Sequence, residues 1–207
     1  DQAPSGAYPA YYRQNFHFQT GGWFTPESAR RYDAQVETLF AGAAAAMRRR
    51  VLSLLARAWR ERDQRGLTVV DAACGAGGFL GDLRRAFPRA SVIGLDLSHA
   101  YVGLAGRRSG AAAVQANVER MPFADGSLDA VTCIYLFHEL PPRVRPAVAA
   151  EFAQNPAVCG SGDFDARMAS AFCGSRNRKG TLSAATSGTS SAISARRTQP
   201  SVASPWR

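Results

Sequence analysis

Two glycines and an aspartate stand at spacings that could hold a nucleoside. Gly75 and Gly77 follow the apolar run at residues 68–70, and Asp96 ends a second apolar run about 20 residues after Gly75. Because glycine has no Cβ, the backbone can turn sharply there and approach a ligand, and the next helix can begin beside it. The Asp96 carboxylate could then accept hydrogen bonds from both ribose hydroxyls. The pattern predicts a strand, loop, helix, strand unit that binds a nucleoside.

Residues 71–78, D-A-A-C-G-A-G-G, resemble motif I of the class I S-adenosylmethionine-dependent methyltransferases. That motif is usually an acidic residue followed by G-x-G-x-G, so Asp71 matches the acidic position. Ala73 departs from the pattern, because the family most often has a glycine there. A positive φ at residue 73 would cost about 1 kcal/mol with alanine, whereas a negative φ would suit it.

The resemblance implies an α/β fold with a doubly wound, Rossmann-like sheet, and S-adenosyl-L-methionine as the cofactor. The chain resembles this family over about residues 11–152. The cofactor-binding residues that we expect are Asp71, Ala73, Gly75, Gly77, Asp96, Leu97, Asn117, Val118 and Tyr135.

Residues 115–131 resemble the family's segment after the third strand. In the family, an Asp or Asn side chain there meets the adenine amino group and the next amide meets the ring. The resemblance therefore implies that Asn117 and Val118 contact adenine. Asp125-Gly126-Ser127 independently predicts a turn into a strand at residues 128–135.

His138 lies in the segment Y-L-F-H-E-L-P-P, residues 135–142, where the family often has a histidine-containing loop near the transferred methyl group. Sheets of this kind bind ligands outside the carboxyl ends of their strands, so the topology predicts His138 near the site. His138 could be the base that accepts the acceptor's proton. The alternative is a packing or helix-capping histidine, and Glu139 is a weaker candidate for the base.

Aromatic residues interleaved with polar ones in residues 6–24 favour a loop over an apolar pocket. Thr25-Pro26 predicts a helix start, and apolar spacing predicts two helices before the first strand. Their apolar stripes are Ala29, Tyr32, Val36, Leu39 and Phe40, then Met47, Val51, Leu54, Leu55 and Trp59. In related methyltransferases such helices cover the cofactor, often with a Tyr-Asp pair like Tyr32-Asp33. We expect Phe18, Trp23 and Tyr32 in a substrate lid; the alternative is that they seal the domain's edge.

The 207 residues, 46% of them hydrophobic, are enough for one globular core. The net charge of +9 is uneven, because residues 153–207 carry seven basic and two acidic side chains. The basic residues lack the aromatic platforms of a nucleic-acid-binding surface, and Arg48-Arg49-Arg50 is typical of a solvated helix face. Nucleic acid is therefore a minor hypothesis, and the resemblance to small-molecule methyltransferases implies a small-molecule acceptor.

The four cysteines show no C-x-x-C pair or histidine spacing, so neither a zinc site nor a disulfide framework is indicated. Cys74 and Cys133 fall in predicted core elements and fit small apolar positions. No apolar run approaches the roughly 20 residues that span a bilayer, and the start does not resemble a signal peptide. These features favour a cytoplasmic protein.

Three regions follow from these patterns. Residues 1–60 form the aromatic lid and its helices, residues 61–152 the cofactor-binding core, and residues 153–207 a low-complexity tail that we expect to be disordered. The three further strands that the class I fold normally has are not visible, so the sheet would lack its last strands. A frameshift near Ala153 is one explanation, because a shifted reading permits Pro-Gly-Gly there; a natural extension on a shortened domain is the other.

The sequence thus predicts methyl transfer to an O, N or C nucleophile of a small molecule, without a metal. One alternative is a cofactor-binding fragment without turnover. A nicotinamide-dependent oxidoreductase is a further alternative, disfavoured because the glycine spacing differs and no Tyr-x-x-x-Lys pair exists in a chain whose only lysine is Lys179.

Overall fold

A four-stranded parallel sheet forms the centre of the computed structural model, which describes residues 8–13, 22–155, 174–176 and 182–184. The strand order is β3-β2-β1-β4, and every neighbouring pair is parallel. The strands are β1 (Thr68–Ala72), β2 (Ser91–Asp96), β3 (Ala112–Gln115) and β4 (Ala130–Cys133). The predicted α/β sheet is confirmed.

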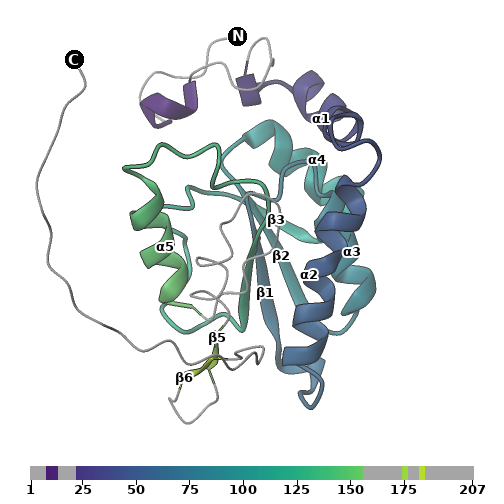
Figure 1. Ribbon diagram of the computed structural model, residues 1–207, viewed down its shortest axis with the longest axis vertical. Coiled ribbons are helices and arrows are strands. Elements are labelled where there is room, and N and C mark those ends of the chain that lie inside the picture. Colours follow the sequence, from purple (N-terminus) through teal and green to yellow (C-terminus); the bar gives the residue numbers. More distant parts are fainter. Residues whose placement is uncertain (1–7, 14–21, 156–173, 177–181, 185–207) are drawn as a thin grey trace, which may run out of the picture.

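Helices cover both faces of the sheet, and Figure 1 shows α5 on one side and α2 and α3 on the other, with α1 lying across the top. The helices are α1 (Pro26–Leu39), α2 (Ala44–Ala58), α3 (Gly78–Ala86), α4 (His99–Ser109) and α5 (Arg145–Ala153). Three short 3₁₀ turns are η1 (Ala10–Arg13), η2 (Gly22–Phe24) and η3 (Gln64–Gly66). Two helices precede β1, as predicted.

Alternation along β1 divides the core between the two faces. Val69 packs with α2 and α3, whereas Val70 and Ala72 pack with the cluster that includes Phe152 of α5. Phe137 joins that second cluster, and its ring meets Phe152 edge to face at 6.1 Å. Phe137 is itself buried. A parallel sheet buried on both faces is the usual arrangement, and it fixes where the strand ends emerge.

The start of α1 is capped as the sequence predicts. The Ser28 N–H donates to Thr25 Oγ1 (3.1 Å), and Pro26 occupies the first turn, where its missing N–H is not needed. The apolar stripes are wrong at two positions. Leu39 is 76% exposed because it ends the helix, and Leu54 is 37% exposed because Val51 and Leu55 define the core-facing side of α2.

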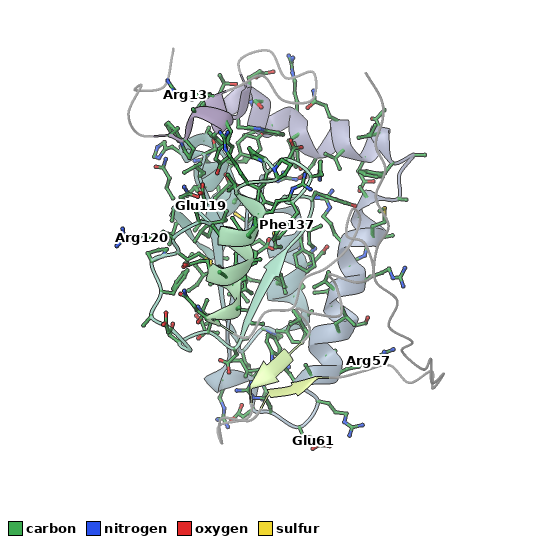
Figure 2. All side chains as sticks on the ribbon, turned by 60° about the vertical axis from the view of Figure 1, so that its left-hand side comes forward. Arg13, Arg57, Glu61, Glu119, Arg120 and Phe137 are labelled. Atoms are coloured by element: carbon green, nitrogen blue, oxygen red, sulfur yellow. The ribbon has the colours of Figure 1, made fainter. Side chains whose placement is uncertain are left out.

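Arg48 contradicts the predicted solvated face. Its side chain is buried, and its guanidinium pairs with the Asp33 carboxylate (3.2 Å), which supplies the opposite charge that burial requires. Arg49 and Arg50 are exposed, as expected. Figure 2 shows Arg57 and Arg120 projecting outward on opposite sides of the molecule.

The fourth strand is shorter than the predicted span of residues 128–135. Tyr135 has a φ of 62°, in the left-handed region, so extended pairing stops before it. The predicted turn before the strand is present, with Gly126 at a φ of 68° and the Ser127 N–H donating to the Ala124 carbonyl (3.1 Å).

Contacts of the core continue past the predicted boundary at residue 152. The Asn155 side chain is buried and accepts from the Leu128 N–H (3.2 Å), and the Gln154 carbonyl accepts from the Gly126 N–H (2.9 Å). Farther along, β5 (Gly174–Arg176) and β6 (Leu182–Ala184) pair antiparallel. The expectation that residues 153–207 form a low-complexity, disordered tail stays a prediction.

Phe18 of the predicted lid and the rest of residues 156–207 lie outside the described residues, and so does most of the segment that the frameshift hypothesis concerns. Across the ranges that the structure describes, no helix has the length and apolar character to cross a membrane. The cytoplasmic location remains a prediction.

Candidate functional site

The glycine loop between β1 and α3 turns through three left-handed residues. The φ values are 58° at Ala73, 55° at Gly75 and 81° at Gly77. The sequence allowed either sign of φ at residue 73, and the structure has the positive one. Ala73 is therefore strained, because its Cβ approaches the following carbonyl oxygen. At Gly77 a Cβ would stand 2.7 Å from the Ala105 Cα, so only glycine lets α3 and α4 pack this closely.

Asp96 ends β2 at the carboxyl edge of the sheet, beside this loop. Its Oδ2 accepts from the Gly75 N–H (2.9 Å) and its Oδ1 accepts from the Ser98 N–H (2.9 Å). A carboxylate offers about four lone-pair positions, so two backbone bonds leave capacity for a ligand. Burial raises the pKa of Asp96, while these backbone N–H donors act in the opposite direction.

Asp71, which the motif implies to be a cofactor-binding residue, lies inside the sheet. Its carboxylate is buried in the sheet and accepts from Thr132 Oγ1 of β4 (2.8 Å), which ties two strands together. Burial raises the pKa of Asp71 to about 7, and the nearby Asp96 carboxylate acts in the same direction. Neither Asp71 nor Gly77 lines the cavity described below.

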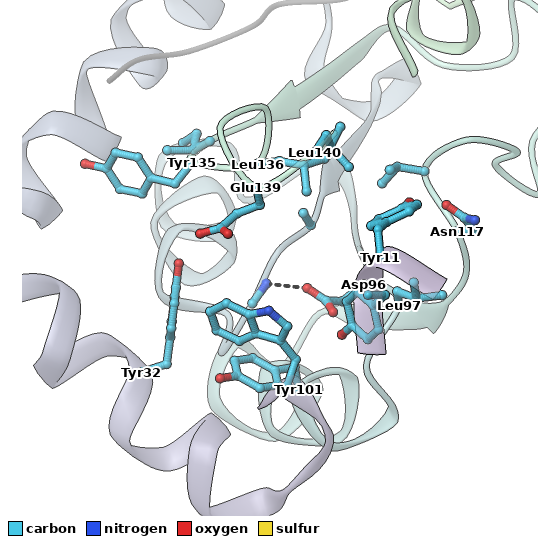
Figure 3. Close-up of a pocket in the computed structure, with 16 residues that line it drawn as sticks. Tyr11, Tyr32, Asp96, Leu97, Tyr101, Asn117, Tyr135, Leu136, Glu139 and Leu140 are labelled. Carbon is cyan, nitrogen blue, oxygen red and sulfur yellow. Dashed lines mark hydrogen bonds between the residues drawn. The ribbon is translucent and has the colours of Figure 1, made fainter. Parts of the chain in front are cut away.

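A cavity that is partly open to solvent lies over the carboxyl ends of the strands, where doubly wound sheets bind ligands. Figure 3 shows Leu97 and Asn117 toward one end and Tyr32 and Tyr135 toward the other, with Asp96 nearer the first. The lining residues are Tyr11, Tyr12, Trp23, Tyr32, Ala73, Gly75, Asp96, Leu97, Tyr101, Asn117, Val118, Ile134, Tyr135, Leu136, Glu139 and Leu140. Most of the predicted cofactor residues thus meet at one cavity.

The predicted adenine segment is held in place from the N-terminal side. Tyr11 of η1 donates to Glu119 Oε1 (2.5 Å), and Asn117 Nδ2 donates to the same carboxylate (3.2 Å). The Glu119 N–H in turn donates a hydrogen bond to Asn117 Oδ1 (3.0 Å). Burial, with the Glu119 carboxylate adding to it, raises the pKa of Tyr11, so its hydroxyl remains a proton donor.

Aromatic rings from three elements form one wall of the cavity. Trp23, Tyr32 of α1 and Tyr101 of α4 meet edge to face, with ring centroids 5.4 to 5.8 Å apart. Tyr101 is 2% exposed and its hydroxyl bonds to that of Ser28 (2.9 Å). The expected lid residues Trp23 and Tyr32 do reach the cavity.

Several lining residues were missed as site residues. Tyr11 and Tyr12 were recognised only as part of an aromatic segment. Tyr101 could have been found, because it lies in the first turn of the helix that follows Asp96. Ile134, Leu136 and Leu140 carry no sequence signal beyond apolarity.

Glu139, rather than His138, faces the cavity. The His138 imidazole is 32% exposed and does not line the cavity, but its Nε2 lies 3.0 Å from Glu139 Oε1. The two residues therefore form a pair of which Glu139 lines the cavity, and the catalytic role of His138 stays a prediction.

An ion network fastens α1 beside the glycine loop. Asp33 pairs with Arg48 of α2 (3.2 Å) and with Arg108 of α4 (2.7 Å), and Arg108 also donates to the Ala76 carbonyl (3.3 Å). Because Tyr32 precedes Asp33 on α1, the network sets where the Tyr32 ring enters the cavity. The Tyr-Asp pair thus divides into a cavity residue and an anchoring residue.

Comparison with known proteins gives a family for this part of the chain. Residues 69–155 match the family model described as a methyltransferase domain. A malonyl-[acyl-carrier protein] O-methyltransferase of Legionella pneumophila is 34% identical over 74 residues, which cover 34% of this chain and 26% of that protein. A demethylmenaquinone methyltransferase of Deinococcus radiodurans is 34% identical over 74 residues, which cover 33% of this chain and 31% of that protein. The chain matches less than a third of the length of these curated relatives.

Solved structures give weaker likenesses. A geranyl diphosphate methyltransferase in complex with GPP and sinefungin has a TM-score of 0.44 and 25% identity, covering 51% of this chain and 39% of its own. DesVI of Streptomyces venezuelae has a TM-score of 0.46 and 22% identity, and the match covers 61% of this chain and 56% of DesVI.

Proposed function

We propose that this chain, whose residues 69–155 match a methyltransferase domain and whose motifs resemble the class I S-adenosylmethionine-dependent methyltransferases, transfers a methyl group to a small-molecule acceptor. The observation that carries the proposal is the position of Asp96, which is held by the Gly75 and Ser98 N–H groups at the edge of a cavity that Asn117 and Val118 also line. The acceptor's nucleophile is an O, N or C atom.

The residues present fit the family's cofactor. The free lone pairs of Asp96 suit the ribose hydroxyls, while Asn117 and Val118 lie where the adenine would be. The opposite end, with Tyr32 and Tyr135, is then the place for the methionine part and the acceptor (Figure 3).

When bound, the cofactor supplies a methyl group already activated by a sulfonium. The chain's task is to align the acceptor and to exclude water, and such alignment can contribute about 7 to 11 kcal/mol. Trp23, Tyr32 and Tyr101 form the wall that excludes water. In this proposal the Glu139 carboxylate receives the acceptor's proton. His138 positions that carboxylate, because its Nε2 lies 3.0 Å from Glu139 Oε1.

Calorimetric titration of S-adenosylhomocysteine and of NAD tests the proposal. We expect the first to bind and the second not to bind. Asp96→Ala should weaken binding by about 1 to 3 kcal/mol through loss of charge-assisted hydrogen bonds. Asp125→Ala, at an exposed aspartate, is the matched control and should bind like the parent chain. Tighter binding of NAD would refute the proposal.

A further inference from the structure

The acceptor end of the cavity carries a carboxylate. Glu139 lies at that end, whereas Asp96 lines the cavity nearer the adenine end, and within the described part of the chain no lysine or arginine lines the cavity. Arg48, whose charge acts on the lining residue Tyr32, is already paired with the carboxylates of Asp33 (3.2 Å) and Glu37 (3.9 Å). The His138 imidazole, when neutral, donates to Glu139 without cancelling its charge. An anionic acceptor would be repelled here, and a cation would be attracted.

The surroundings of Glu139 suit a cation with an apolar body. Figure 3 places Glu139 with Tyr32 and Tyr135, away from Leu97 and Asn117 at the adenine end. Aromatic faces attract an ammonium group by about 0.5 to 2 kcal/mol, more when water is excluded. Tyr135 is itself fixed, because its ring stacks on Phe40 at 5.3 Å. Aliphatic lining residues, Ile134, Leu136 and Leu140, can accept the rest of such a molecule.

We propose that the methyl acceptor is a small amine with an apolar or aromatic body, bound through its ammonium group to the Glu139 carboxylate between Tyr32 and Tyr135. This inference rests on the proposed methyltransferase function and narrows the nucleophile from O, N or C to N. Glu139 acts here as the residue that determines specificity.

The chemistry balances without any further reactant. The bound ammonium first releases one proton to water through Glu139, which leaves the neutral amine. The nitrogen lone pair then forms the new N–C bond to the methyl carbon while the S–C bond breaks and its electrons remain on sulfur. The product is a methylammonium beside a neutral thioether. Because positive charge moves onto the nitrogen, the Glu139 carboxylate stabilises the transition state more than the neutral amine that precedes it.

Three probes of matched shape test this selectivity: 2-phenylethylamine, 2-phenylethanol and 3-phenylpropionate, which are cationic, neutral and anionic at neutral pH. Each is titrated calorimetrically into the full chain saturated with S-adenosylhomocysteine. We expect the amine to bind at least tenfold more tightly than the alcohol, and the carboxylate more weakly than either. With S-adenosylmethionine, mass spectrometry should detect the N-methylated amine.

Glu139→Gln should remove the preference for the amine while leaving the affinity for the alcohol within twofold. Glu61→Gln, at a glutamate whose side chain is 81% exposed, is the matched control and should keep the preference. If Glu139→Gln does not fold, the ranking of the three probes by the parent chain decides alone. Equal or tighter binding of the alcohol or carboxylate, or no binding of the amine, overturns this inference. Loss of S-adenosylhomocysteine binding would instead overturn the proposed function and this inference with it.

Discussion

At the scale of single residues, Ala73 is strained, since a φ of 58° brings its Cβ close to the following carbonyl oxygen. Ala73→Gly should relieve about 1 to 2 kcal/mol, partly offset by about 0.5 to 1 kcal/mol of additional entropy in the unfolded chain. We therefore expect the free energy of unfolding, measured by urea denaturation, to rise by up to about 1 kcal/mol.

The neighbouring alanine provides the control for this change. Ala72 is fully buried in β1 and has no positive φ, so Ala72→Gly should lower the free energy of unfolding. An equal loss of stability in Ala73→Gly would show that the loop tolerates the alanine Cβ without strain.

Asp71 should make stability depend on pH. Burial raises its folded-state pKa to about 7, above the usual 3.8, so between these values the folded chain holds a proton that the unfolded chain has lost. Stability therefore falls as pH rises from about 4 to about 7, by up to about 4 kcal/mol. Asp71→Asn should flatten this decline in urea denaturation at pH 5 and pH 8.

Two comparisons make the pH result specific. Burial also raises the pKa of Asp96. The free energy of unfolding of the Asp71→Asn variant should therefore still fall with pH, but less steeply. Asp125→Asn, at an exposed position, should keep all of the pH dependence. An Asp71→Asn variant with the full pH dependence would mean that Asp71 is ionised in the folded protein throughout this range.

The residue types of the cofactor end could be predicted from the sequence, because glycine loops and strand-end carboxylates have fixed spacing. Gly75 and Asp96 are joined by a hydrogen bond as that spacing implies. The end that we propose for the acceptor could not be predicted in the same way. Tyr101 and Glu139 come from separate segments, and only the packing of the helices brings them to one cavity.

At the scale of elements, the Asp33 network should control how firmly α1 is held. Asp33→Asn leaves the Arg48 side chain, 11% exposed, with only the Glu37 carboxylate at 3.9 Å. Breaking a buried pair costs about 3 to 5 kcal/mol, and the remaining partner should reduce this to about 2 kcal/mol. We expect a lower urea midpoint together with weaker binding of S-adenosylhomocysteine.

Glu27→Gln is the matched change on the same helix. Glu27 pairs with Arg30 (2.7 Å) and Arg31 (2.7 Å) on the exposed side of α1, where water screens the charges. The urea midpoint and the affinity should both stay close to those of the parent chain. If both variants lose stability and affinity to a similar extent, the cause is any change of charge on α1 rather than the loss of the Asp33 network.

The existence of the elements was easier to predict than their ends. The cap at Thr25 and the glycine loop mark helix starts by local chemistry, and the structure has both. The end of β4 is set by the positive φ at Tyr135. Tyrosine does not favour a positive φ, so the residue types there do not predict this end. The burial of Arg48 likewise depends on Asp33 from another helix, which a helical pattern alone does not contain.

At the scale of the whole molecule, Asn155 should close the described domain. Its Oδ1 accepts from the Leu128 N–H (3.2 Å) just before β4, and the side chain is 3% exposed. Asn155→Ala leaves that buried donor without its acceptor and should cost about 1 to 3 kcal/mol in thermal or urea unfolding. Gln154→Ala should cost much less, because Gln154 contributes its backbone carbonyl. Equal stability of the two variants would contradict a closing role.

The register of β1 has a consequence for how the chain folds. Thr68 pairs with Ser91 of β2, whereas Val69 pairs with Ala130 of β4, much farther along the sequence. Each doubling of a closed loop adds about 0.6 kcal/mol of entropy, so we expect β1, β2 and β3 to assemble first and β4 to dock late. Until then one edge of β1 presents unpaired N–H and C=O groups to other molecules. The speed at which β4 docks would then govern how much protein aggregates during refolding.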